Sequence, residues 1–261
     1  MNDRSSANQT RRSVLSTSSI QLFAAAPDLA DSLTPQEREE AQQIALPMAQ
    51  VAGPLDLPEL LRNANAFAAF VVDGMLLRKL RIGAQPTLRI FGPGELIATG
   101  TAPTPAVVVE SDYSAVDSTH LAFVGIEFLT VAHKWPRLIA GLQGRMADGQ
   151  ERLATQLAIC QLPRVQDRLL SMLWLLAESW GRVTSAGTTL SLLLTHEALG
   201  TLVGARRSTV TLALRELTDS GALVHQGGAW LLLEPPSTPA KSATTRSPRV
   251  SVAEAGPPSS L

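Results

Sequence analysis

Apolar and polar positions alternate most regularly between residues 194 and 221, where their spacing predicts two short helices joined by a turn. Thr195 is placed to cap the first helix, and Gly204 can adopt the left-handed backbone that a tight corner needs. The predicted inward-facing positions are Ala198, Leu199, Leu202, Val210, Leu214 and Leu217. Those of the second helix recur at steps of four and three, so the segment is expected to form a helix-turn-helix.

The start of the second helix has a polar outer face, opposite its apolar positions. With the cap residue of the first helix, it supplies the predicted DNA-binding residues: Thr195, Arg206, Arg207, Ser208, Thr209, Thr211 and Arg215. Guanidinium and hydroxyl groups donate to phosphates and base edges, as a helix in the major groove must do. The pattern therefore predicts binding to double-stranded DNA. The competing interpretation is an ordinary helical hairpin buried in an enzyme.

From about residue 51 to residue 130 the pattern changes to short β-like runs separated by Gly, Pro and Asp. The expected strands are residues 66–72, 76–82, 87–91, 106–110, 113–117 and 120–126. Asp73 and Gly74 form a dipeptide typical of a hairpin turn between the first two strands. Strands that recur about every ten residues favour a β-sandwich or β-roll.

Further helices are predicted on both sides of this β region. One has Thr34 as its cap and Pro35 at its first position, and is expected to run to about Leu46. Residues 136–162 are predicted to form one long helix, and residues 163–180 an amphipathic one. The long helix carries an apolar stripe: Leu142, Met146, Leu153, Leu157 and Cys160. Periodicity alone fits a core helix and a two-stranded dimer seam equally well.

The remaining C-terminal pattern predicts a loop, a short strand and a hairpin. The loop is expected at residues 181–187 and the strand at residues 188–194. Residues 224–233 form the expected hairpin, with Gly227 and Gly228 as its turn.

Residues 195–223 resemble the winged helix-turn-helix of the cyclic-AMP receptor protein and fumarate-nitrate regulator (Crp/Fnr) superfamily of bacterial transcription regulators. That family has a T-x-x-x-[IL]-[AG]-x-[LIM]-x-G run, then a Ser/Arg-rich recognition helix and L-x-x-L-x-x-x-G-[LI]. The matching positions are Thr195, Leu199, Gly200, Leu202, Gly204, Arg207, Ser208, Thr209, Val210, Leu214, Leu217, Gly221 and Leu223. Residues 89–97 are similar to a Gly-rich turn of the family's sensory domain.

The resemblance implies an α+β fold: an N-terminal jelly-roll (cyclic-nucleotide-binding-like) β-domain, a long dimerisation helix and a C-terminal winged helix-turn-helix. The expected domains are a disordered arm (1–31), the β-roll with its preceding helix (32–133), the dimerisation helix (134–162), the DNA-binding domain (163–234) and a disordered tail (235–261). A homodimer is implied, with the apolar stripe of the long helix as its seam. RNA polymerase is a further partner that the resemblance suggests.

The cyclic-nucleotide site of the family has a Gly-Glu turn followed, a short distance on, by Arg-[ST]-Ala. This chain keeps Gly94 and Glu95 but has no basic residue from there to Lys134. Because an arginine is the donor suited to the cyclic phosphate, we expect no cyclic-nucleotide binding and a solvated Glu95. Either an apolar or organic effector inside the roll, or a domain that only dimerises, fits the sequence, so the effector is unknown.

The recognition helix also departs from one pattern within the family. Members that read a TGTGA-like half-site carry Arg-Glu-x-x-x-Arg over this helix. Here Arg207 matches the first position, but Ser208 stands in place of the glutamate and Leu212 in place of the second arginine. A different half-site is therefore expected.

Composition adds limits on function. The chain is 45% hydrophobic and 17% charged, with a formal net charge of −1, which fits a globular protein with little overall field. Its single cysteine, Cys160, excludes an intramolecular disulfide, and no apolar run reaches the ~18 residues that span a membrane. No signal peptide is recognised, so a cytoplasmic location is expected. Paired carboxylates, a catalytic triad and metal-ligand spacing are not found, so we expect neither an enzyme nor a cofactor.

Charges in the predicted DNA-binding segment balance. The residues from 190 to 233 hold Arg206, Arg207 and Arg215 against Glu197, Glu216 and Asp219. Non-specific DNA affinity should therefore be modest, with reliance on a dimer and on extra backbone contacts from Arg164, Arg168 and Arg182. The alternative function is a β-roll module that binds a small molecule or a protein and contacts DNA weakly.

Overall fold

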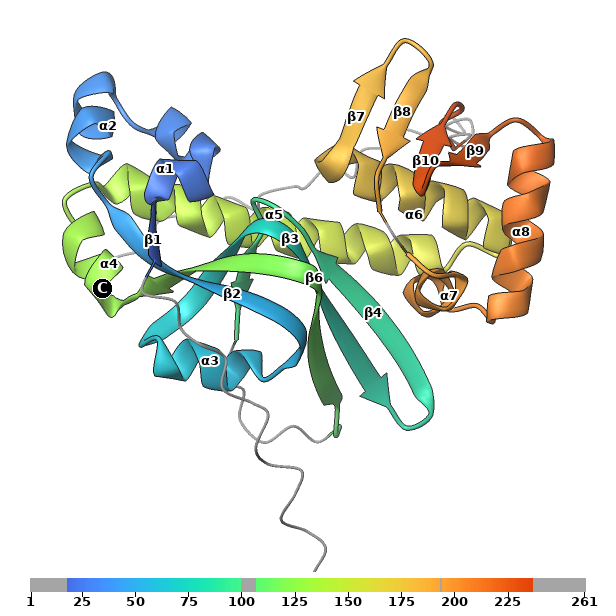
Figure 1. Cartoon of the computed structure of the whole chain (residues 1–261), viewed down its shortest axis with the longest axis horizontal. Helices are drawn as coiled ribbons and strands as arrows, with labels where there is room; N and C mark the ends of the chain where they lie inside the picture. Colours follow the sequence, from blue (N-terminus) through green and yellow to red (C-terminus); the bar gives the residue numbers. More distant parts are fainter. Residues whose placement is uncertain (1–17, 100–106, 193, 237–261) are drawn as a thin grey trace, which may run out of the picture.

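The structure is a computed structural model that describes residues 18–99, 107–192 and 194–236. Figure 1 shows a β-sheet domain, a long helix α5 (Pro136–Cys160) that passes behind it, and a C-terminal domain at the far end of that helix. Within the described ranges, none of the helices has both the length and the apolar character needed to cross a bilayer.

The first described residues pack into the β-sheet domain. They form β1 (Ser18–Gln21), α1 (Leu22–Ala25) and the 3-10 helix η1 (Pro27–Ser32). Leu22, Ala26 and Leu29 are buried, because the apolar patch of this segment contributes to the core under α5. The expectation of a disordered arm to residue 31 is therefore wrong from Ser18 onward. Residues 1–17 of that arm, and residues 237–261 of the expected tail, lie outside the described residues.

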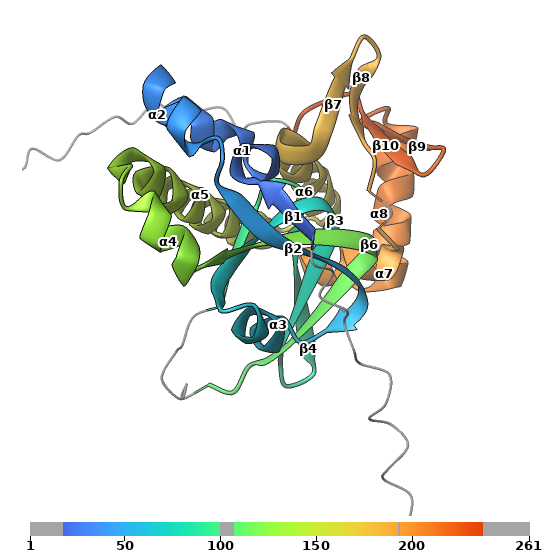
Figure 2. The same ribbon diagram turned by 60° about the vertical axis from the view of Figure 1, so that its left-hand side comes forward.

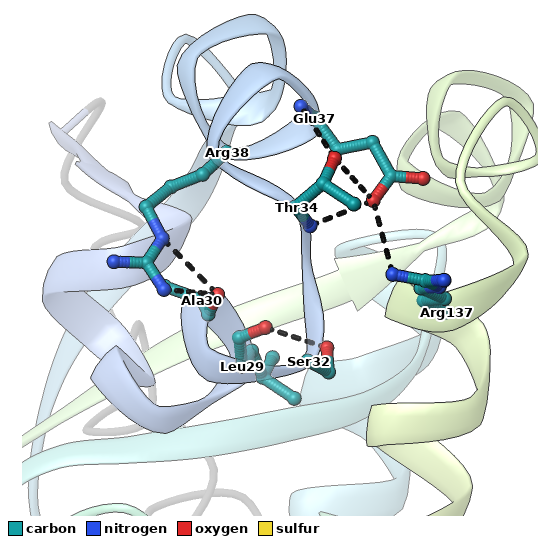
Figure 3. Close-up of polar contacts among 7 residues, drawn as sticks. All are labelled: Leu29, Ala30, Ser32, Thr34, Glu37, Arg38 and Arg137. Carbon is teal, nitrogen blue, oxygen red and sulfur yellow. Dashed lines mark hydrogen bonds and ion pairs between the residues drawn. The ribbon is translucent and has the colours of Figure 1, made fainter.

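A capping box begins α2 (Pro35–Ala41), as the sequence predicted. The Thr34 N–H donates to Glu37 Oε2 at 2.8 Å, and the Glu37 N–H donates to Thr34 Oγ1 at 3.3 Å (Figure 3). The hydrogen bonds from the backbone and the side chain of Thr34 hold the pKa of the Glu37 carboxyl below its ordinary value. The same carboxylate lies 4.0 Å from the guanidinium of Arg137, which joins the helix start to α5.

α2 is shorter than the sequence predicted. It ends at Ala41, and Leu46, the expected end of the helix, is buried in the strand that follows. Leu46 pairs there with Ile20 of β1, so sheet formation overrides the local helical pattern.

All strands of the six-stranded sheet are antiparallel, in the order β1-β2-β6-β3-β4, with β5 also paired to β3. The strands after β1 are β2 (Ala45–Leu55), β3 (Ala66–Ile82), β4 (Gln85–Phe91), β5 (Leu96–Ala98) and β6 (Glu110–Gly125). Strands β3 and β6 are long and strongly bent, and they form the centre of the roll (Figures 1 and 2).

The predicted hairpin turn at Asp73 and Gly74 is wrong. Residues 66–82 form one strand, and these two residues make an irregularity in its pairing with β6. Gly74 has φ 75°, and a Cβ there would lie 2.6 Å from Thr119 Oγ1. The buried Thr119 hydroxyl accepts the Met75 N–H at 3.1 Å and donates to the Met75 carbonyl at 2.9 Å. The positive φ thus serves a β-bulge held by the neighbouring strand.

Another pair of predicted strands is also a single strand that continues through an irregularity. The expected strands at residues 113–117 and 120–126 are both part of β6, which continues through Asp117 at φ 51°. Residues 107–109 precede that strand, and residue 106 lies outside the described part. Strand β4 lies close to its prediction at residues 87–91.

Besides α1 and η1, two helices of this domain have no counterpart in the prediction. Helix α3 (Leu57–Asn63) buries Leu57, Leu60 and Leu61 against the inside of the roll. Helix α4 (Ile126–Ala132) leads from β6 into α5 and packs in the same hydrophobic core as α1 and the start of α5.

The C-terminal domain is built on α6 (Val165–Trp180), which buries Leu169, Met172 and Leu173. Its other elements are β7 (Gly181–Thr184), β8 (Gly187–Leu190), α7 (His196–Val203), α8 (Arg207–Asp219), β9 (Leu223–Gln226) and β10 (Ala229–Leu232). The four strands form one sheet in the order β7-β8-β10-β9. The expected loop at residues 181–187 is mostly β7, and the expected strand at residues 188–194 ends at Leu190.

Candidate nucleic-acid interface

Two glycines close the corner between α7 and α8. Thr195 caps the start of α7, where its Oγ1 accepts the Ala198 N–H at 3.1 Å, and Gly204 caps the end of the helix in the left-handed region (φ 68°, ψ 43°). The Ala205 N–H then donates to the Gly200 carbonyl at 2.8 Å. A Cβ on Gly200 would lie 2.5 Å from the Ala205 carbonyl oxygen, so this close approach requires glycine.

Helix α8 rests on α6 and α7 through its apolar side. The buried residues of α8 are Val210, Ala213, Leu214 and Leu217. Three of them were predicted to face inward, and the structure confirms those three. Figure 1 shows α8 at the outer edge of the C-terminal domain. The side of α8 opposite its buried residues therefore faces away from the rest of the chain.

That outward side carries the predicted DNA-binding residues. Arg206, Arg207, Ser208, Thr209, Thr211 and Arg215 are all exposed. The Thr211 hydroxyl donates to the Arg207 carbonyl at 3.0 Å and lies 2.9 Å from His196 Nδ1, which orients it beside α7. Arg215 Nε lies 3.8 Å from Asp219 Oδ2 in an exposed ion pair. Such a pair is weak, so it leaves the guanidinium available to a phosphate.

The start of α8 offers backbone donors as well as side chains. Its N-cap, Arg206, makes no side-chain capping hydrogen bond, and no acidic residue lies in the first turn. A helix start carries partial positive charge and uncapped N–H groups, which suit an anion such as phosphate. Arg206 and Arg207 flank the same end. Thr195 is also exposed, but its hydroxyl oxygen already caps α7.

A hairpin wing follows α8, as predicted. Strands β9 and β10 are joined by Gly227 (φ 60°) and Gly228 (φ 80°), and β10 also pairs with β8. The His225 ring packs on the Trp230 ring, with centroids 4.2 Å apart. The wing is thus part of a four-stranded sheet that supports α8.

The arginines upstream of the motif differ in availability. Arg168 donates to the Leu162 carbonyl and, at 3.4 Å, to the Val203 carbonyl. Arg168 therefore ties α6 to the end of α7. Arg164 and Arg182 are exposed.

The apolar stripe of α5 is covered at its two ends and open between them. Leu142 is only 6% exposed and packs in the chain's own core with α1 and α4. Cys160 is half-buried, its Sγ lies 3.5 Å from a carbonyl of α7, and burial raises the pKa of its thiol. Met146, Leu153 and Leu157 are exposed, Leu157 by 60%. The predicted dimerisation set thus has two members inside the protomer and three on an open face.

Glu95 lies in a buried charge cluster, contrary to the solvated position that the sequence analysis expected. Its side chain is 14% exposed, accepts the Gly92 N–H at 3.0 Å and lies 3.4 Å from Nε of Arg152. Burial raises the pKa of its carboxyl above the ordinary value. Arg89 from β4 and Arg145 from α5 line the same cavity, which measures about 160 Å³. Positive charge therefore reaches this turn from Arg89 in the preceding strand and from α5, which is distant in the sequence.

The arginines around Glu95 are already paired within the chain. Their partners are the Gly149 carbonyl for Arg89, Asp28 and the Gly94 carbonyl for Arg145, and Glu95 and Ser179 for Arg152. These contacts hold β4, the β4–β5 turn and α5 together, although the buried Nε atoms of Arg145 and Arg152 make no hydrogen bond.

The same turn touches the C-terminal domain. A Cβ on Gly92 would lie 2.4 Å from Cε2 of Trp180, the last residue of α6. Arg152 donates to Ser179 at the same helix end. Leu88 and Ile90 of β4 pack in the hydrophobic cluster of the C-terminal domain. The β-sheet domain, α5 and the start of the C-terminal domain therefore meet at this point.

Sequence reasoning missed the role of some of these residues. Gly200 was treated only as part of a motif, although its position one turn before Gly204 was the available signal for a close approach. Leu212 was noted only as a departure, and the structure places it on the exposed side of α8. In the described ranges, no group of three or more His, Cys, Asp or Glu residues could hold a metal ion.

Comparison with known proteins agrees with this arrangement. Residues 164–237 match the model of the Crp-like helix-turn-helix domain family. The structure is similar to FixK2 from Bradyrhizobium japonicum, with a TM-score of 0.57 and 16% identity over 73% of this chain and 94% of that one. It is also similar to a CooA mutant from Carboxydothermus hydrogenoformans, with a TM-score of 0.56 and 18% identity over 72% and 84% of the two chains.

A third similar structure is a cyclic nucleotide-binding domain containing protein from Listeria monocytogenes EGD-e (TM-score 0.57, 14% identity, 70% and 87% of the two chains). At such identities the likeness shows the fold alone. That fold is the expected α+β arrangement of N-terminal β-roll, long helix and C-terminal winged helix-turn-helix. No curated protein matches the sequence significantly.

Proposed function

We propose that this chain is a dimeric transcription regulator of the Crp/Fnr type that reads a two-fold symmetric DNA site, on the basis of its Crp-like helix-turn-helix domain and its fold. The observation that carries the proposal is the outward face of α8. Every predicted contact residue on it is exposed, and its apolar side is fully committed to α6 and α7.

In this proposal the first half of α8 enters a major groove. Arg206, Arg207 and the uncapped N–H groups of the helix start bind backbone phosphates. Ser208, Thr211 and Arg215 lie further along the exposed face and reach base edges. Arg164 and Arg182 add backbone contacts from the neighbouring elements.

The dimer is proposed to form through the open face of α5. Met146, Leu153 and Leu157 recur at steps of seven and four, which places them on one side of a helix. Pairing these faces in parallel buries apolar side chains that a lone protomer exposes to water. It also presents two copies of α8, as a palindrome with half-sites ~34 Å apart requires.

The sensory domain is proposed not to bind a cyclic nucleotide. The cavity beside Glu95 measures about 160 Å³, well below the ~300 Å³ at which small-molecule pockets begin. Its arginines are also paired with carboxylates and carbonyls of the chain itself, so a phosphate would have to displace them. RNA polymerase is a further proposed partner of this protein.

Selection of bound sequences from a random DNA pool tests the proposal. The full-length protein is expected to recover a palindrome, and Arg207→Ala is expected to weaken binding to it by at least several-fold. Arg62→Ala removes an exposed arginine on α3, far from α8, and should leave binding unchanged. Affinity should fall steeply with salt because phosphate contacts release counterions. Recovery of no motif, with an affinity that does not depend on salt, would instead support a β-roll module with weak DNA contact.

A further inference from the structure

Leu212 is an apolar residue on the polar outward face of α8. It is 58% exposed, whereas Val210, Ala213, Leu214 and Leu217 of the same helix are buried. At 3.6 residues per turn, Ser208, Leu212 and Arg215 lie together near the middle of the side opposite those buried residues. Leu212 therefore stands between a hydroxyl and a guanidinium on the face that the proposed function turns toward DNA.

Exposure of a single leucine is common on protein surfaces and carries no conclusion by itself. The position of Leu212 is informative, because α8 packs on α6 and α7 and only the side that carries Leu212 is free to meet a duplex. The leucine side chain has no hydrogen-bond donor or acceptor, so it cannot read the polar edge of a base. The apolar group that bases display in the major groove is the C5 methyl of thymine.

We propose that Leu212 is a specificity-determining residue that reads a thymine through its C5 methyl group. Each half-site of the target then carries a T·A pair beneath Leu212, next to the positions that Ser208 and Arg215 contact. This inference rests on the proposed function, because it requires that α8 binds the major groove. It also explains the departure at this position, where an arginine would favour guanine and leucine cannot.

Replacing thymine with deoxyuridine in the selected palindrome tests the inference directly, because it removes the methyl group and keeps every base-pair hydrogen bond. Fluorescence anisotropy titrations compare the two duplexes, one thymine position at a time in both half-sites. At one position the uracil duplex is expected to bind the wild-type protein about fourfold more weakly per half-site, and about fifteenfold with both half-sites changed. Leu212→Ala is expected to bind both duplexes equally.

Matched variants separate this contact from its neighbours. Leu233→Ala truncates another exposed leucine outside α8 and should keep the full uracil penalty. Thr211→Ser removes a nearby exposed methyl and should keep it too. Leu212→Arg should shift the preference at that base pair toward guanine. Thermal unfolding shows whether each variant keeps its fold.

The outcomes are distinguishable. A palindrome that is bound equally well with thymine and with uracil at every position refutes the inference while leaving the proposed function intact. A uracil penalty that persists in Leu212→Ala, or disappears in Thr211→Ser, assigns the methyl contact to another residue and also refutes it. Failure of the wild-type protein to select any duplex refutes the proposed function, and the inference with it.

Discussion

Gly200 is the point of closest approach in the helix-turn-helix corner, and we expect Gly200→Ala to push the two helices apart. A Cβ there would lie 2.5 Å from the Ala205 carbonyl oxygen and 3.5 Å from Val210 Cγ2. The nearer atom belongs to the backbone, so it cannot rotate away as a flexible side chain could. Ala205 is itself held by its N–H bond of 2.8 Å to the Gly200 carbonyl. Relief of the clash must therefore open the turn.

The change in the free energy of unfolding caused by Gly200→Ala is the sum of opposing contributions. Alanine is favoured over glycine inside a helix by ~1 kcal/mol. Overpacking against a fixed neighbour costs ~1–3 kcal/mol, and loss of the Ala205–Gly200 hydrogen bond costs ~1 kcal/mol more. The sum lowers the free energy of unfolding of the C-terminal domain by about 2 kcal/mol. DNA affinity should fall with it, because α8 is displaced from α7.

Urea unfolding of the full-length protein, followed by tryptophan fluorescence, measures this loss. Gly144→Ala is the matched control, since Gly144 lies in α5 with nothing within 4 Å of a built Cβ. That variant should be more stable than wild type by up to ~1 kcal/mol. If Gly200→Ala gains stability as Gly144→Ala does, the close approach of Gly200 to the Ala205 carbonyl is refuted.

The remaining predictions concern the other sites. The double variant Leu153→Glu and Leu157→Glu should sediment as a 27.7 kDa monomer, because like charges cannot be buried in the α5 seam. The control Val183→Glu, at a residue of β7 that is 83% exposed, should remain a dimer. Burial raises the pKa of the Glu95 carboxyl above its ordinary value of 4.5, so the protonated carboxyl stabilises the folded protein. This contribution to the free energy of unfolding is fully present below pH 4.5 and should be lost as the pH rises through the raised pKa. Urea unfolding at a series of pH values should show the loss in the wild-type protein but not in Glu95→Gln. Gly92→Ala should lower the thermal unfolding temperature and change the tryptophan emission, because its Cβ would meet the last indole of α6; an unchanged spectrum would argue against that contact.

The helix-turn-helix was predictable because its determinants are local. A cap at Thr195, a left-handed glycine at position 204 and apolar spacing within each helix lie within a few residues of what they determine. The limits of α7 and three inward residues of α8 followed from them. The helix cap at Thr34 was predicted in the same way. The end of the helix it begins was not, because that depends on pairing with another strand.

The β-roll shows why local signals were insufficient elsewhere. Asp73 and Gly74 have the composition of a tight hairpin, and Gly74 does adopt positive φ. Whether that φ makes a turn or a bulge is decided by the Thr119 hydroxyl, which holds Met75 from the adjacent strand. The sequence alone does not show which strand is adjacent. One long strand was therefore read as two.

The α5 stripe illustrates the same limit at a candidate site. Leu142 and Leu157 belong to one periodic pattern, yet one is buried in its own chain and the other is open. The difference arises because α1 and η1 cover only the first part of α5, and these elements fall in a segment predicted to be a disordered arm. Because the N-terminal segment was predicted to be disordered, Leu142 was wrongly included in the predicted seam.

The turn at Glu95 shows that local sequence signals were also insufficient to predict ligand binding. Absence of an arginine shortly after Glu95 was the reason to exclude a phosphate ligand, but Arg89, Arg145 and Arg152 surround this carboxylate in the fold. The exclusion must therefore rest on other grounds. What now supports it is that each arginine is already paired within the chain and that the cavity is about 160 Å³. Because Arg152 also bonds Ser179 at the end of α6, a ligand that displaced it would disturb the C-terminal domain directly.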